Sequence, residues 1–265
     1  AILLFSLRRF HSQPIYVLCD LFTKENVKRY NFHNVVFDVD ANAKELMETA
    51  SSYRDEVIKN SYHRPDCIAK KMDAIERATF LYGNTLFLDS DIVPVGPLYS
   101  DITHPVMVSP HYHANNKLDN MKKYGAYNAG YVFSSELGLA DAWREIYLDR
   151  SLFFEQEGMI YFHERFDVGV FPETHNVGFW RFKLGHGSMD FEGSSASELR
   201  NIRSFHAHLT DSLFPRADAG LRKVYQEMKG YVMGYLRERQ PEIYKFANSF
   251  QRLIPTQSRD LWKKI

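Results

Sequence analysis

Two aspartates, one residue apart, directly follow a short apolar run. The run is Thr85-Leu86-Phe87-Leu88, and Asp89, Ser90 and Asp91 come next. An apolar run of this length predicts a buried strand, and acids just beyond it would lie at the carboxyl edge of a sheet, where α/β folds bind ligands. Mg²⁺ and Mn²⁺ prefer oxygen ligands, commonly one or two carboxylates together with substrate phosphates. The stretch therefore predicts a metal–diphosphate site, although Asp and Ser are also common where a strand turns.

Two histidines extend this hypothesis near the end of the strand-rich part of the chain. His206 and His208 lie two residues apart in a predicted strand, so both side chains point to one face of the sheet. If that face meets the ligand edge, one imidazole completes a metal site begun by the two aspartates. The alternative is a pair of hydrogen-bonded structural histidines, and the sequence does not choose between them.

A helix and a strand carry further polar candidates. Lys70 and Lys71 lie on the predicted helix that precedes the Asp-x-Asp strand, and one of them could reach a phosphate while the other stays solvated. Asn128-Ala129-Gly130 offers an amide and a residue without a side chain, which allows a ligand to approach the backbone closely. A tight bend explains the same tripeptide equally well.

A third candidate is Glu155-Gln156-Glu157-Gly158, at the start of a predicted helix. Its carboxylates and amide could hydrogen-bond a sugar or assist a leaving group. Acids are also favoured in any first helical turn by the helix dipole, so the stretch alone does not decide.

Composition limits the classes of function. The 265 residues contain 33 Lys and Arg and 33 Asp and Glu. The chain therefore lacks the excess of positive charge that is typical of proteins that bind nucleic acid. No apolar run approaches the roughly 18–20 residues that span a membrane. Cys19 and Cys67 are far apart and read as buried free thiols, which favours a reducing compartment. We expect a cytoplasmic protein, with the inner face of a membrane as the alternative location.

Strand-length apolar runs alternate with segments of helical spacing, which predicts an α/β fold with a mostly parallel sheet. Residues 111–124 are polar and predict a mobile loop, and residues 217–265 predict helices without a strand. The expected strands are residues 14–20, 34–37, 85–88, 106–109, 128–133 and 203–208, with 167–170 and 176–178 returning the chain to the sheet. The expected helices are residues 1–10, 23–30 (capped by Thr23), 41–60, 65–83, 136–149 and 155–163.

In their order and spacing these pieces resemble a nucleotide-sugar glycosyltransferase of the GT-A fold, similar to the glycogenin and galactosyltransferase-like family 8 group. The resemblance covers about residues 1–216 and implies a Rossmann-like catalytic domain with a mixed, mostly parallel sheet, followed by a helical extension over 217–265. The family's first strand has no counterpart here, and we expect it to lie upstream. The pieces that carry the resemblance are Lys71, Asp89-Ser90-Asp91, Asn128-Ala129-Gly130, Glu155-Gln156-Glu157-Gly158 and His206.

The resemblance also implies roles for these residues. Asp91 and His206 would bind Mn²⁺ or Mg²⁺, and Asp89 would contact the metal and the ribose of the donor. Donor-binding residues would be Lys71, Ser90, Asn128, Ala129 and Gly130, with Glu155 or Gln156 near the anomeric carbon.

Two departures from the family pattern leave alternatives open. The usual His-x-x-Gly-x-x-Lys-Pro-Trp ending is absent, so Arg216 would replace the missing lysine on the diphosphate, and His208 could be the metal ligand instead of His206. The resemblance implies a retaining reaction, but Glu155 or Glu157 could act as the base of an inverting one.

The function expected from the resemblance is transfer of a hexose, with UDP the expected nucleotide, to a glycan or lipid-linked acceptor. One alternative is a haloacid-dehalogenase-like phosphatase with Asp89 as nucleophile, although no later paired-acid motif is found. A second alternative is a glycan-binding relative without catalysis. The C-terminal helices could pack on their own domain, which is the simplest expectation, form a homodimer or lie on an anionic membrane.

Overall fold

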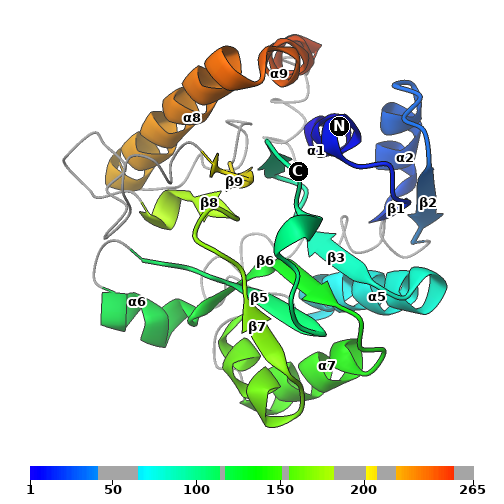
Figure 1. Ribbon diagram of the computed structural model, residues 1–265, viewed down its shortest axis with the longest axis vertical. Helices are drawn as coiled ribbons and strands as arrows, with labels where there is room; N and C mark the ends of the chain where they lie inside the picture. Colours follow the sequence, from blue (N-terminus) through cyan, green and yellow to red (C-terminus); the bar gives the residue numbers. More distant parts are fainter. Residues whose placement is uncertain (41–64, 114–116, 151–154, 182–200, 208–218, 254–265) are drawn as a thin grey trace, which may run out of the picture.

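The computed structural model describes residues 1–40, 65–113, 117–150, 155–181, 201–207 and 219–253 (Figure 1). The predicted helix over 41–60 lies outside these ranges. The described elements are α1 (Ile2–Phe10), β1 (Ile15–Cys19), α2 (Leu21–Lys28), β2 (Val35–Val39), α5 (Pro65–Tyr82), β3 (Thr85–Leu88), β4 (Ile92–Pro94), η1 (Tyr99–Asp101), β5 (Val106–Pro110), α6 (Lys117–Tyr124), β6 (Tyr127–Ser134), α7 (Leu139–Arg150), η2 (Glu157–Glu164), β7 (Val168–Val170), β8 (Val177–Gly178), η3 (Phe179–Arg181), β9 (Ser204–His206), α8 (Ala219–Arg239) and α9 (Pro241–Leu253).

The described strands form two mixed sheets and one parallel pair, so the α/β class is confirmed and the expectation of mostly parallel pairing is wrong. The central sheet has the order β3-β6-β5-β7, a second sheet has β4-β9-β8, and β1 pairs with β2. Among the described strands, three pairings are antiparallel, namely β3 with β6, β5 with β6 and β4 with β9. The apolar runs show which residues form strands, but they carry no signal for the direction in which distant strands pair.

Helices α5 and α7 cover one face of the central sheet. Met72 and Ile75 of α5 and Trp143 of α7 are buried against Val108 of β5 and Val132 of β6. Helix α5 begins at Pro65, as predicted, because proline suits a first helical turn. It ends at Gly83, where φ is +78° and the backbone N–H donates to the Thr79 carbonyl at 2.8 Å.

The C-terminal helices are part of a hydrophobic core that they share with the strands. Figure 1 shows α8 and α9 along one side of the molecule, with α9 next to α1. The rings of Phe5 in α1 and Phe246 in α9 stack at a centroid distance of 4.2 Å. The simplest expectation for this segment, packing against its own chain, is what the described residues show. The buried apolar side chains of α8 and α9 in this core are Val224, Met228, Val232, Leu236, Ile243 and Ala247.

Three local predictions need correction. Residues 117–124 of the expected loop form helix α6, and His111 and His113, in the same stretch, are buried. The helix expected from residue 155 is the 3-10 helix η2. Helix α2 is capped by Asp20, whose carboxylate accepts a hydrogen bond from the Thr23 backbone N–H, rather than by Thr23 itself.

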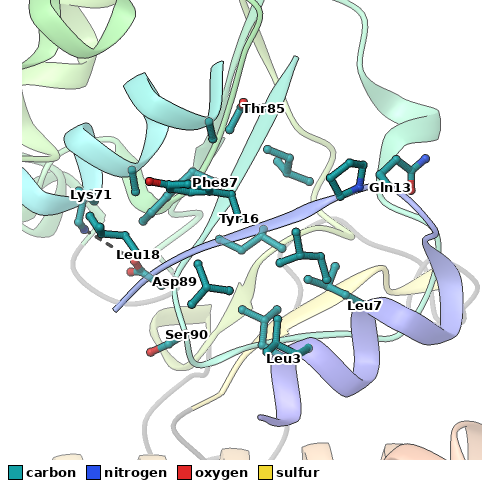
Figure 2. Close-up of a pocket in the computed structure, with 18 of the residues that line it drawn as sticks. Leu3, Leu7, Gln13, Tyr16, Leu18, Lys71, Thr85, Phe87, Asp89 and Ser90 are labelled. Atoms are coloured by element: carbon teal, nitrogen blue, oxygen red, sulfur yellow. Dashed lines mark ion pairs between the residues drawn. The ribbon is translucent and has the colours of Figure 1, made fainter. Parts of the chain in front are cut away.

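A cavity of about 1080 Å³ separates β1 from β3, with α1 and α5 also contributing to its wall. Among the described strands, β1 pairs only with β2, and β3 only with β6, so both strands have an unpaired edge. In Figure 2, Lys71, Asp89 and Ser90 lie at one end of this cavity, while Leu3 and Leu7 of α1 form part of its apolar wall. Cys19 also lines it and is a free thiol, half-buried rather than buried as expected.

No helix in the described part of the chain is long and apolar enough to cross a membrane.

Candidate functional site

The two aspartates occupy the turn between β3 and β4, and strand pairing brings His206 to them. The Ile92 backbone N–H donates to the Asp89 carbonyl at 3.0 Å, which closes the turn. Strand β4 then pairs with β9 so that Ile92 lies opposite His206. As a result His206 Nε2 lies 3.1 Å from Asp91 Oδ1. Asp89, Asp91 and His206 each offer one ligand atom, and all three atoms lie within 4.8 Å of one another.

This donor set fits a divalent cation. Two carboxylate oxygens and one imidazole nitrogen converge, and carboxylates are the ligands that Mg²⁺ and Mn²⁺ take most readily. The imidazole favours a transition metal such as Mn²⁺ over Mg²⁺. Asp89 and Asp91 are half-buried while His206 is buried, so one side of the cluster stays accessible to a ligand.

Gly130 of β6 packs directly against Asp89 and His206 of this cluster. A Cβ at this position would lie 2.4 Å from Asp89 Oδ2 and 2.9 Å from His206 Cε1, so only glycine fits. The Asp89 backbone N–H donates to the Gly130 carbonyl at 2.9 Å, which fixes the distance between the two segments. The sequence predicted a close approach of a ligand at Gly130; the groups that approach are the carboxylate and the imidazole of the site itself.

The His206 ring is enclosed on several sides. Its Nδ1 lies 2.9 Å from Asn176 Oδ1, and Trp180 packs edge-on to it at a centroid distance of 5.1 Å. Burial lowers the pKa of His206, but the carboxylates of Asp91 and Asp89 outweigh this effect and the pKa lies above its ordinary value. The two acids therefore stabilise positive charge on the imidazole, on the side where a metal cation would bind.

Asn176 is a residue of the site that the sequence reasoning did not single out. It is fully buried, has φ of +51°, and its backbone N–H donates to Ser204 Oγ at 2.8 Å. Its Nδ2 lies 3.0 Å from Ser109 Oγ and 3.1 Å from Asn128 Oδ1. The only sequence signal is a polar residue just before the short strand β8, which is too common to be diagnostic.

Lys71 points inward, as one of the two lysines was expected to do. Its Nζ lies 2.6 Å from Glu155 Oε1 and 3.8 Å from Asp89 Oδ1. Burial lowers the pKa of Lys71, but the charges of Asp89 and Glu155 outweigh it, so the pKa is raised and the ammonium stays charged. Trp143 Nε1 donates to the Glu155 carbonyl at 2.9 Å and holds that residue in place. Lys70 instead pairs with Asp40 at 2.8 Å.

The other predicted residues lie at different distances from this cluster. Ser90 is exposed at the end of the cavity, whereas the Ala129 side chain is buried in the hydrophobic core. Gln156 precedes η2, and its carbonyl oxygen would lie 2.9 Å from a Cβ at Gly125. Glu157 is the first residue of η2. His208 and Arg216 fall outside the described residues.

A second buried polar cluster adjoins the site and was also missed. His111 stacks on His113 at 4.6 Å and meets Trp180 edge-on at 5.3 Å. His111 Nδ1 lies 3.1 Å from the Gly125 carbonyl oxygen, and its Nε2 lies 3.4 Å from Asn128 Nδ2. Burial and the neighbouring His113 lower the pKa of His111 to about 3. The ring is therefore neutral and serves as a packing element.

Comparison with known proteins adds no assignment. No protein-family model matches the sequence, and no curated protein matches it.

Proposed function

We propose that the protein is a metal-dependent glycosyltransferase that moves a hexose from a nucleoside diphosphate sugar, UDP-hexose first among them, to a glycan or lipid-linked acceptor. The observation that carries the proposal is the convergence of Asp89 and Asp91, in the turn between β3 and β4, with His206 of β9 into one set of ligand atoms. A divalent cation bound there would neutralise charge on the diphosphate as it leaves. We also propose that the protein has a GT-A fold, that its donor is a nucleoside diphosphate sugar, and that the reaction retains the anomeric configuration.

The surroundings of the cluster support a charged, extended ligand. The cavity between β1 and β3 ends at Asp89 and Ser90, and its volume of about 1080 Å³ is near the upper end of ligand sites. Lys71 brings a buried positive charge to the same end, where it can contact a phosphate or a sugar hydroxyl. The apolar wall suits a nucleoside, whose base offers flat faces for packing.

Within this proposal the residues have distinct tasks. Asp91 and His206 would hold the metal, and Asp89 would contact both metal and ribose. Lys71 would bind the donor, with its charge balanced by Glu155 at 2.6 Å until the donor arrives. Gln156 and Glu157 lie at the start of η2, beside Gly125, and are the further candidates near the anomeric carbon.

The test is a donor screen. UDP-, GDP- and TDP-hexoses are incubated with the protein in Mn²⁺ or in EDTA, and release of nucleoside diphosphate is recorded. We expect release from one nucleotide class, dependent on metal, lost in Asp91→Asn and kept in Asp141→Asn, which alters an exposed carboxylate on α7. The anomeric configuration of the product, read by NMR, tests retention.

Two outcomes would replace the proposal. Hydrolysis of p-nitrophenyl phosphate without release from any sugar nucleotide would favour the phosphatase with Asp89 as nucleophile. Glycan binding that is unaffected by EDTA, again without release, would favour a non-catalytic relative.

A further inference from the structure

The hydrogen bonds around Asn176 fix a proton on Nδ1 of His206. The chain of contacts starts at the backbone of Gly130, whose N–H lies 3.0 Å from Asn128 Oδ1. A backbone N–H can only donate, so the side-chain oxygen of Asn128 must face it. The orientation of the Asn128 amide, which is otherwise ambiguous between its two ends, is thereby determined.

The same reasoning determines the orientation of the Asn176 side-chain amide. Asn128 Oδ1 lies 3.1 Å from the Asn176 amide, and two oxygens cannot hydrogen-bond without a proton between them, so Asn176 presents its Nδ2. That Nδ2 also donates to Ser109 Oγ at 3.0 Å. Both protons of the amide are used, and its oxygen is left facing His206.

The last link is the imidazole. Asn176 Oδ1 can only accept, so the His206 Nδ1 that lies 2.9 Å away carries the proton. Nε2 lies on the side of Asp91, 3.1 Å from Oδ1, and is the nitrogen that would offer its lone pair to a metal once its own proton is lost. Histidine ligands of metals commonly donate the second ring N–H to an acceptor in this way, and removal of that acceptor typically costs 10- to 100-fold in metal affinity.

We propose that Asn176 is a positioning residue that holds His206 as the Nδ1–H tautomer and thereby sets the affinity of the Asp89–Asp91–His206 site for a divalent metal. This inference rests on the metal site of the proposed function. Asn176 is not one of the three candidate ligand residues and acts through the His206 ring. Its amide is held by Ser109 and Asn128, and its backbone by Ser204, so the acceptor is in place before a metal arrives.

Two substitutions separate the acceptor from the rest of the side chain. Asn176→Gly removes the oxygen and tolerates φ of +51°, whereas alanine would be strained there. Asn176→Asp keeps an oxygen on His206 Nδ1 and also tolerates this φ. Both variants lose the two donations from Nδ2. Asn176→Asp keeps the acceptor, but it also brings a charge and places an oxygen opposite Asn128 Oδ1, so the effect of charge needs its own control.

The measurement is Mn²⁺ binding by isothermal titration calorimetry and by the EPR signal of free Mn²⁺, without any sugar nucleotide. We expect Asn176→Gly to bind Mn²⁺ about 10- to 100-fold more weakly than the wild type. Asn176→Asp should stay within about threefold of the wild type or bind more tightly, because a carboxylate also accepts from imidazole. Thermal unfolding in EDTA measures the metal-free stability of each variant, so that a loss of fold is not mistaken for a loss of Mn²⁺ affinity.

Added charge is controlled with Asn128→Asp. This variant places a carboxylate in the same network, bonded to the Gly130 N–H but not to His206. The gain in Mn²⁺ affinity of Asn128→Asp over the wild type is compared with the gain of Asn176→Asp over Asn176→Gly. If the two gains are equal, the added charge explains the difference between the Asn176 variants, and the inference is overturned. If Asn176→Gly does not fold, Ser109→Ala, which loosens the same amide, should weaken Mn²⁺ binding by less than the about 10- to 100-fold typical of a lost acceptor, and unchanged binding would overturn the inference.

The outcomes for the inference and for the proposed function differ. A wild type that binds no divalent metal overturns both. A wild type that binds Mn²⁺ while Asn176→Gly binds it equally well leaves the metal site standing and overturns the role of Asn176.

Discussion

A methyl group on Gly130 would lie 2.4 Å from the carboxylate oxygen Oδ2 of Asp89, closer than any non-bonded contact allows. The opposing atoms belong to a half-buried carboxylate and to the buried ring of His206, so making room for the methyl group would shift a ligand residue of the cluster. This contact explains why a residue without a side chain lies in the middle of the buried strand β6.

We expect Gly130→Ala to weaken Mn²⁺ binding by at least about tenfold, because the methyl group displaces a metal ligand. Overpacking of this kind also costs roughly 1–3 kcal/mol in the free energy of unfolding. Calorimetric titration with Mn²⁺ and urea denaturation measure the two effects. Gly138→Ala is the matched control, since a Cβ there meets nothing within 4 Å. Unchanged Mn²⁺ affinity in Gly130→Ala would contradict the contact described here.

Lys71 and Glu155 form a buried pair that should behave differently in single and double variants. Removing Lys71 alone, as in Lys71→Met, leaves the Glu155 carboxylate, only 8% exposed, without its partner. Such a loss typically costs about 3–5 kcal/mol, whereas replacing both partners with apolar residues is often nearly neutral. We therefore expect Lys71→Met to be strongly destabilised and Lys71→Met/Glu155→Met to recover most of that loss.

The double variant also separates stability from donor binding. Its fold should be restored, but nucleoside diphosphate release should stay low, because the positive charge near Asp89 and the Glu155 carboxylate are both gone. Urea denaturation measures the free energy of unfolding of each variant, and the donor screen measures its nucleoside diphosphate release. Wild-type release in the stable double variant would exclude Lys71 from donor binding.

The parts of the site that depend on local pattern could be predicted, and those that depend on distant pairing could not. An apolar strand followed by Asp89-x-Asp91 and a late strand ending at His206 are visible in the sequence, since each is a run of a few residues. Their meeting depends on the antiparallel register of β4 against β9, which places Ile92 opposite His206. No periodicity in either segment encodes that register.

Asn176 illustrates the same limit more sharply. Its partners Ser109, Asn128 and His206 come from three different strands, so its role exists only in the folded chain. Helix α6 was missed for another reason. Residues 117–124 contain few apolar side chains, and a short polar helix resembles a loop in any reading based on hydrophobic spacing.

The stacked rings of Phe5 and Phe246 provide a test of whether α9 stabilises the rest of the fold. The two rings are nearly parallel, with an interplanar angle of 6°, and Tyr30 also packs edge-on against Phe246. We expect Phe246→Ala to lower the free energy of unfolding by about 2–4 kcal/mol, through lost burial and lost ring contacts. Lys245→Ala, an exposed neighbour on α9, is the control. A separate, early thermal transition confined to the variant would show instead that α9 unfolds independently.

The acid dependence of stability should report the buried ring of His111. Its pKa is lowered to about 3, first by burial, while the unfolded chain has the ordinary value of 6.5. Between these two values the unfolded state binds a proton that the folded state does not, so stability falls as the pH drops below 6.5. The contribution is present above pH 6.5 and is lost progressively toward pH 3.

His111→Gln removes this proton uptake and should be less stable than the wild type at pH 7, because its hydrogen bonds to Gly125 and Asn128 are altered. At about pH 4.5 the difference in free energy of unfolding should shrink by about 1–2.5 kcal/mol, since each unit of pKa shift corresponds to about 1.36 kcal/mol. Urea denaturation at both pH values measures it, with the exposed His33→Gln as the control. A difference that stays constant or widens on acidification would mean that the folded protein accepts a proton at His111, and the ring would then be a charged part of the site rather than a neutral packing element.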